Sequence, residues 1–197
     1  MISFKSITQL VILLFISVLI SNCGQKPETK KEKTPQELAF DEYQKKRLAE
    51  FETYFADGSM VPGLESWQMV ALLMDWNLGD NRYATLSIFR GGKTKIFTST
   101  GAKDMEIEHQ NVYNEITRFL QNAERLSPYA QPMNHTKLPE EDHFNFYFKT
   151  NAGSSKAEGF IGDVQNNSSE WADLFRQANA VITEVRATYQ DFGSNPG

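Results

Sequence analysis

Phe144-Asn145-Phe146-Tyr147-Phe148-Lys149 is the stretch of this sequence that decides the fold. Phenylalanine alternates with more polar residues at a period of two, which is typical of a β-strand with one buried face. Asn151-Ala152-Gly153 then predicts a turn, and 155–161 predicts a returning strand. We expect the three phenylalanines to face the core. Asn145, Tyr147 and Lys149 would then point outward, onto an open face of the sheet.

A long amphipathic helix is predicted after this hairpin. It begins at Ser168-Ser169-Glu170 and fades near Tyr189, and its apolar stripe consists of Trp171, Leu174, Phe175, Ala178, Val181, Ile182 and Val185.

The same order of elements occurs earlier in the chain. Residues 83–89 alternate, Gly91-Gly92 marks a hairpin turn, and 93–100 gives a second strand. An amphipathic helix with apolar residues from Val112 to Leu126 follows. A hairpin followed by a helix therefore appears twice, at 82–126 and 143–189. An internal duplication and a chance recurrence of a common unit both remain open.

An N-terminal helix is predicted before these two units. Thr34-Pro35-Gln36-Glu37 combines a capping box with proline at the first helical position. Leu38, Leu48, Phe51 and Phe55 recur at roughly helical spacing up to Asp57-Gly58. The helix should lie on the surface of the domain, because its polar content is high.

Residues 67–76 can be interpreted in two ways. Their Leu, Met and Ala content favours a helix, whereas the turn signals on both sides favour a strand. We expect a buried strand. The predicted fold class is therefore α+β: an antiparallel β-sheet with helices packed on one face, built from two consecutive ββα units preceded by an N-terminal helix.

The first 22 residues have the pattern of a secretory signal peptide. Lys5 supplies a short positive region, 10–20 is apolar except for Ser17, and Ser21-Asn22 precede the only cysteine, Cys23. A membrane-spanning helix needs about 20 apolar residues, which is more than this run provides.

The string around Cys23 resembles the lipobox, the cleavage motif of bacterial lipoproteins. In that family a leucine-like residue lies three or four positions before the cysteine and small residues follow it, as Leu19 and Ser21 do here. Asn22 departs from the Gly or Ala of the common pattern. The resemblance covers 1–24 and implies cleavage before Cys23, which would carry a thioether-linked diacylglycerol and an N-acyl chain.

The resemblance divides the chain into three parts. Residues 1–22 would be a lipoprotein signal peptide, 23–35 a lipidated flexible tether with four lysines, and 36–197 a single α+β globular domain. The tether lysines could attract anionic headgroups or simply keep the linker solvated. The domain has 15 Lys and Arg against 23 Asp and Glu, a net charge of −8. This acidic balance argues against a nucleic-acid partner.

Catalytic and metal-binding motifs are weak in this sequence. His109, His135 and His143 do not have the spacing of a metal site, so we expect no metal or other cofactor. The chain has no nucleophile elbow, and Gly91-Gly92-Lys93-Thr94 lacks the first glycine of a phosphate loop. Residues 140–143, Glu-Glu-Asp-His, form an acidic loop that is more typical of a solvated surface than of a catalytic site.

Three functional hypotheses follow. We favour a lipid-anchored protein of the cell envelope, whose domain binds an envelope or extracellular protein or another ligand. One alternative is a small envelope hydrolase that uses the acidic loop near His143, and another is a purely structural lipoprotein. Gly24 favours the outer membrane, because aspartate after the lipidated cysteine retains lipoproteins in the inner membrane of well-studied bacteria. Trp67, Trp76 and Trp171 could form a sugar- or peptide-binding platform, although core packing is the simpler interpretation for Trp171.

Overall fold

The computed structural model describes residues 32–56, 61–107 and 109–193. Cys23, the predicted signal peptide and most of the predicted tether lie outside the described residues. The chain from Thr34 onward forms one compact unit. Its elements are α2 (Pro35–Tyr54), β1 (Met69–Asn77), β2 (Tyr83–Phe89), β3 (Thr94–Thr98), β4 (Met105–Ile107), α3 (Gln110–Leu126), the 3₁₀ turn η1 (Ser127–Tyr129), β5 (Gln131–Pro132), β6 (His143–Thr150), β7 (Gly153–Phe160), α4 (Ile161–Asn166) and α5 (Glu170–Gly193).

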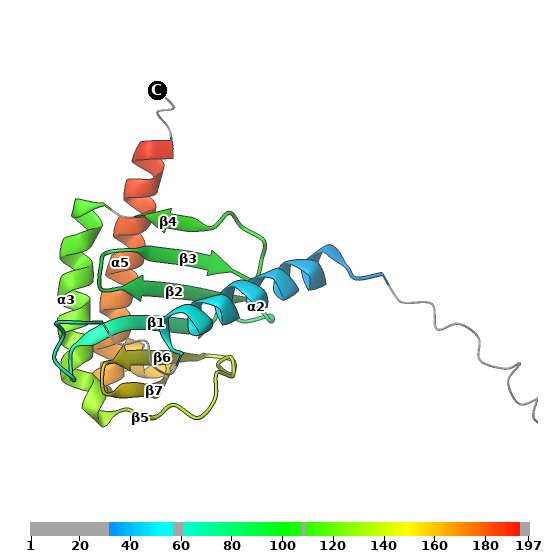
Figure 1. Ribbon diagram of the computed structural model, residues 1–197. Helices are drawn as coiled ribbons and strands as arrows, with labels where there is room; N and C mark the ends of the chain where they lie inside the picture. The colour runs from blue at the N-terminus through cyan, green and yellow to red at the C-terminus, as the bar shows by residue number, and fades with distance from the viewer. Residues whose placement is uncertain (1–31, 57–60, 108, 194–197) are drawn as a thin grey trace, which may run out of the picture. The chain divides into compact units, whose positions relative to one another are not determined.

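The strands form one seven-stranded antiparallel sheet in the order β4-β3-β2-β1-β6-β7-β5. The two predicted hairpins, β2–β3 and β6–β7, lie on either side of β1 (Figure 1). The ambiguous apolar run is the central strand β1, so the strand interpretation is confirmed. Gly92 has a φ of +96° in the β2–β3 turn, a conformation that glycine adopts without strain. The α+β prediction with an antiparallel sheet is confirmed.

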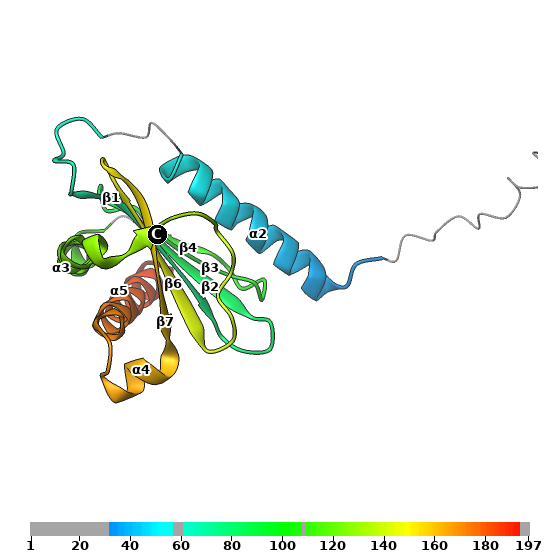
Figure 2. The same cartoon turned by 90° about the horizontal axis from the view of Figure 1, so that it is seen from below.

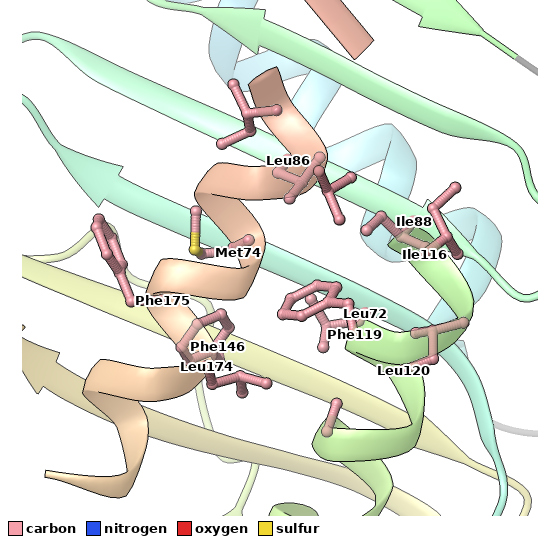
Figure 3. Packing of buried hydrophobic residues seen from close by; sticks show 14 of the residues in the cluster. Leu72, Met74, Leu86, Ile88, Ile116, Phe119, Leu120, Phe146, Leu174 and Phe175 are labelled. Carbon is pink, nitrogen blue, oxygen red and sulfur yellow. The ribbon is translucent and has the colours of Figure 1, made fainter. Parts of the chain in front are cut away.

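Helices α3 and α5 pack side by side on one face of the sheet (Figures 1 and 2). Phe144, Phe146 and Phe148 face these helices, as their alternation predicted, and all three are buried. Figure 3 shows Phe119 of α3 and Phe146 of β6 within this core, and their ring centroids are 6.4 Å apart. The amphipathic stripes of both helices thus bury the main apolar cluster.

Helix α2 lies on the opposite face of the sheet (Figure 2). Its predicted capping box is present, because the Glu37 backbone N–H donates to Thr34 Oγ1 at 3.2 Å and the Thr34 backbone N–H donates to Glu37 Oε2 at 2.7 Å. The predicted apolar stripe is only half right. Phe51 and Phe55 are buried, but Leu38 and Leu48 are exposed. Polar residues of α2 occupy the buried positions instead.

The prediction that Asn145, Tyr147 and Lys149 face an open surface is wrong. All three side chains are buried. Helix α2 contributes to this burial, since the Phe51 ring meets the Tyr147 ring edge-on at 4.8 Å. The loop before β6 contributes as well, because the carbonyl of Lys137 accepts hydrogen bonds from Tyr147 Oη at 2.8 Å and from Asn145 Nδ2 at 3.1 Å.

Two short strands and one short α-helix have no counterpart in the sequence prediction. Strands β4 and β5 have three and two residues, and α4 has six. Each is too short to show a period, so its formation depends on the neighbours that it pairs with or packs against. Among the described residues, no helix combines the length and the apolar character needed to cross a membrane.

Candidate functional site

Two polar clusters contain the unusual chemistry of this domain, one on the α2 side of the sheet and one at the β5–β7 edge. The first lies beneath α2, where Arg47 is 2% exposed and Asp75 of β1 is fully buried. Arg47 Nε and one of its terminal nitrogens lie 2.7 and 2.6 Å from Asp75 Oδ2. Thr85 donates to Asp75 Oδ1 at 2.6 Å, and the Tyr43 hydroxyl lies 2.9 Å from Thr85 Oγ1. Helix α2 is therefore fixed to two strands by hydrogen bonds between charged and polar groups.

Burial governs the electrostatics of this cluster. It raises the pKa of Asp75, whereas the contacts with Arg47 and Thr85 act in the opposite direction and lower it. Burial alone would lower the pKa of Arg47, but the Asp75 carboxylate raises it above its ordinary value. Among the described residues, no buried side-chain nitrogen or oxygen lacks a hydrogen-bond partner. The cluster is thus a charged pair with a complete set of partners, and it is closed to solvent.

Titration of the tyrosines should reveal this burial. Burial raises the pKa of Tyr43 and Tyr147, and the Asp75 carboxylate raises both further. We expect both phenols to stay protonated as the pH passes the ordinary tyrosine value of about 10. In the unfolded chain the two phenols lose their protons near pH 10, whereas in the folded chain they keep them. The free energy of unfolding should therefore fall as the pH rises above about 10.

Phenolate absorbance measured against pH tests this expectation. A late phase should coincide with alkaline unfolding, and it should shrink in Tyr43→Phe and in Tyr147→Phe. A late phase of unchanged size in both variants would contradict the assignment.

The second cluster is a hollow of about 380 Å³ at the edge of the sheet where β5 meets β7. Its aromatic residues are Tyr129, which ends η1 and is 70% exposed, and Trp171 in the first turn of α5. Gln131, Asn134 and His135 contribute polar groups from β5 and the segment that follows it. The hollow falls in the roughly 300–1,000 Å³ range of small-molecule sites.

Two charged side chains of β7 also line the hollow. Lys156 is 6% exposed, and its Nζ lies 2.5 Å from Glu158 Oε1. The hydrogen bond from Lys156 lowers the pKa of Glu158, so this carboxylate stays ionised at neutral pH. Lys156 Nζ also lies 5.6 Å from the centroid of the Tyr147 ring. Because Tyr147 Oη accepts from Arg47 at 3.2 Å, polar contacts lead from the hollow to the cluster beneath α2.

The structure does not gather the histidines into one site. His143 begins β6, and its Nδ1 is 2.7 Å from the carbonyl oxygen of Glu141. His135 lines the hollow, whereas His109 directly precedes α3. Within the described ranges, no group of three or more His, Cys, Asp and Glu side chains could hold a metal ion.

The acidic loop borders another hollow. Glu140 and Glu141 lie there with Asp80 of the β1–β2 turn. Their carboxylates make this hollow acidic, and none of its lining residues lines the hollow at the β7 edge.

The tryptophans have different environments. Trp76 is buried in the core, and Trp67 is exposed. Trp171 packs against the core cluster, with its ring centroid 5.9 Å from that of Phe148, and it also lines the hollow. The core interpretation of Trp171 is therefore correct but incomplete.

Sequence reasoning missed most of the residues that define the two clusters. Lys156 and Glu158 alternate along one strand, which could have indicated a shared face. Nothing in the sequence pairs Arg47 with Asp75, which lies 28 residues further along the chain.

Comparisons with protein families, with curated proteins and with solved structures gave no match for this chain.

Proposed function

We propose that this chain is a lipid-anchored protein of the cell envelope whose α+β domain binds a ligand in the hollow between β5 and β7. The binding part of this proposal is based on the hollow. It is accessible and combines two aromatic rings with a few polar groups, which is the usual composition of a ligand site. The position of Cys23 between an apolar run and a lysine-containing segment supports the anchor. Membrane lipid would then be the first partner, through the acyl chains on Cys23.

The state of Glu158 does not suit the general-acid role of a hydrolase. A general acid needs a carboxyl group whose pKa is raised towards the working pH. The Lys156 hydrogen bond instead lowers the pKa of Glu158. An ionised carboxylate held by a lysine is suited to accepting hydrogen bonds from a ligand. The exposed ring of Tyr129, which lines the same hollow, also favours a binding role over a purely structural one.

Helix α2 suits a tethered domain. It begins at Pro35, the last residue of the predicted tether, and its Arg47 is bonded to the central strand. The chain therefore enters the folded unit through an element that is fixed to the sheet. A domain attached in this way can be held near the membrane without losing its own packing.

Lipidation is tested by replacing Cys23 with serine. The wild-type protein should partition into the detergent phase, and its N-terminal peptide should carry acyl mass. Cys23→Ser should enter the aqueous phase, because stable anchoring requires two or more acyl chains. In a density gradient, the wild-type protein should sediment with outer-membrane markers. An acylated N-terminus that persists in Cys23→Ser would refute the assignment, and sedimentation with the inner membrane would refute the expected location.

A further inference from the structure

The aromatic residues of the β5–β7 hollow differ in how firmly they are held. The Trp171 indole packs on Phe148, and the Trp171 backbone N–H donates to Ser169 Oγ at 3.1 Å. Tyr129 has most of its ring exposed at the end of η1. Both rings line the hollow, and the exposed phenol ring of Tyr129 leaves apolar surface accessible there. A ligand with a flat apolar face can cover that surface and remove it from water.

The charges of the hollow favour a ligand without net charge. Lys156 and Glu158 neutralise each other at 2.5 Å, and Lys156 is almost fully buried. An anionic ligand would have to displace Glu158 from Lys156. A neutral ligand with hydroxyl groups can donate to the remaining lone pairs of Glu158 and exchange hydrogen bonds with Gln131 and Asn134.

The edge of the sheet leaves little room for a peptide strand. Strand addition requires a row of unpaired backbone groups. On β7, Ser155 and Lys156 already pair with β5, and the carbonyl of Ser154 accepts from the Met133 backbone N–H at 3.1 Å. At the far end of β7, Phe160 directly precedes α4. The hollow therefore suits a compact ligand better than an extended chain.

We propose that this hollow binds a neutral saccharide of one or two rings, an inference that rests on the proposed binding function. A pyranose ring has an apolar C–H face, which matches the exposed ring of Tyr129. Trp171 borders the hollow from the α5 face of the sheet, opposite the face that carries Glu158. Its hydroxyl groups lie around the rim of the ring, where Glu158 and the side-chain amides of the hollow can reach them. The same residues thus provide apolar stacking and polar recognition for one class of ligand.

Titration calorimetry on the full chain tests the proposal, in a detergent whose headgroup contains no sugar. The probes are glucose, N-acetylglucosamine, its β-1,4-linked dimer and maltose, with glucose 6-phosphate as the charged comparison. At least one neutral saccharide should bind saturably with a Kd of about 1 mM or lower. It should change the tryptophan fluorescence of the wild-type chain more than that of Trp171→Phe. Tyr129→Ala should weaken binding about tenfold or more, and Glu158→Gln about fivefold. Tyr113→Ala, which removes an exposed tyrosine from α3, should leave the affinity unchanged.

Three outcomes would overturn the saccharide assignment. The first is a panel in which no neutral saccharide binds saturably. The second is an affinity that neither Tyr129→Ala nor Glu158→Gln changes. The third is tighter binding of glucose 6-phosphate than of glucose. A peptide that binds with the same dependence on Tyr129 would exclude the saccharide but leave the proposed binding function intact. An unlipidated Cys23 would refute the anchor without affecting the saccharide.

Discussion

Replacing Arg47 with methionine should lower the free energy of unfolding by about 3–5 kcal/mol, because Asp75 would remain buried without its partner. Arg47 is 2% exposed and Asp75 is fully buried, so water cannot take the place of the lost contacts. This loss is a large share of the roughly 5–15 kcal/mol that typically stabilises a domain. Urea denaturation followed by circular dichroism measures it.

Two further variants distinguish the effect of an unpaired buried charge on stability from the effect of lost packing. Arg47→Met combined with Asp75→Leu should recover most of the loss, because apolar pairs often replace buried ion pairs with little cost. Recovery should be incomplete, since Thr85 and Tyr147 also lose partners. Lys46→Met is the matched control on α2. The Lys46–Asp104 pair is 40% exposed on both sides, so this change should cost about 1 kcal/mol or less. Equal losses in Arg47→Met and Lys46→Met would contradict the account.

Phe119→Ala should also lower the free energy of unfolding by about 3–5 kcal/mol, because it leaves a cavity in the main core. Phe119 is fully buried between α3 and the sheet, near Phe146 (Figure 3). Tyr113→Ala on the same helix is the control, since its ring is 43% exposed. That variant should lose about 1 kcal/mol or less. The same urea denaturation experiment applies, and a Phe119→Ala protein as stable as Tyr113→Ala would show that α3 does not pack as described.

The sequence predicted the parts of the fold that depend on local periodicity. Phe144, Phe146 and Phe148 face the core because a strand alternates its faces, and this holds whatever the neighbouring strands are. The Gly91-Gly92 turn and the Thr34 cap are equally local, because a few adjacent residues determine each of them. These features need no knowledge of the tertiary structure.

The docking of α2 could not be predicted in this way. Tyr43, Arg47 and Glu50 are polar or amphipathic, and their spacing on a helix usually indicates a solvated face. They are buried because Thr85, Asp75 and Ser87 provide matching partners on β2 and β1. Recognising such a match requires knowledge of which strand residues lie opposite the helix.

The candidate site was hidden for the same reason. Tyr129, Lys156 and Trp171 come from η1, β7 and α5, which meet only in the folded chain. Sequence analysis considered Trp171 as a possible binding residue but could not supply its neighbours. The acidic loop before β6 could be recognised as a possible catalytic site from the sequence, because its carboxylates and His143 are adjacent in the chain.

The central structural claim is that α2, which begins where the predicted tether ends, is a fixed part of the domain. Native-state hydrogen exchange of the backbone amides in 43–51 tests it most directly. In the wild-type chain these amides should exchange through the same global opening as those of β1, because the Arg47–Asp75 pair joins the two elements. In Arg47→Met the α2 amides should exchange faster than those of β1. Rapid exchange of α2 in the wild-type chain, with β1 still protected, would show that the helix separates from the sheet and would contradict the account.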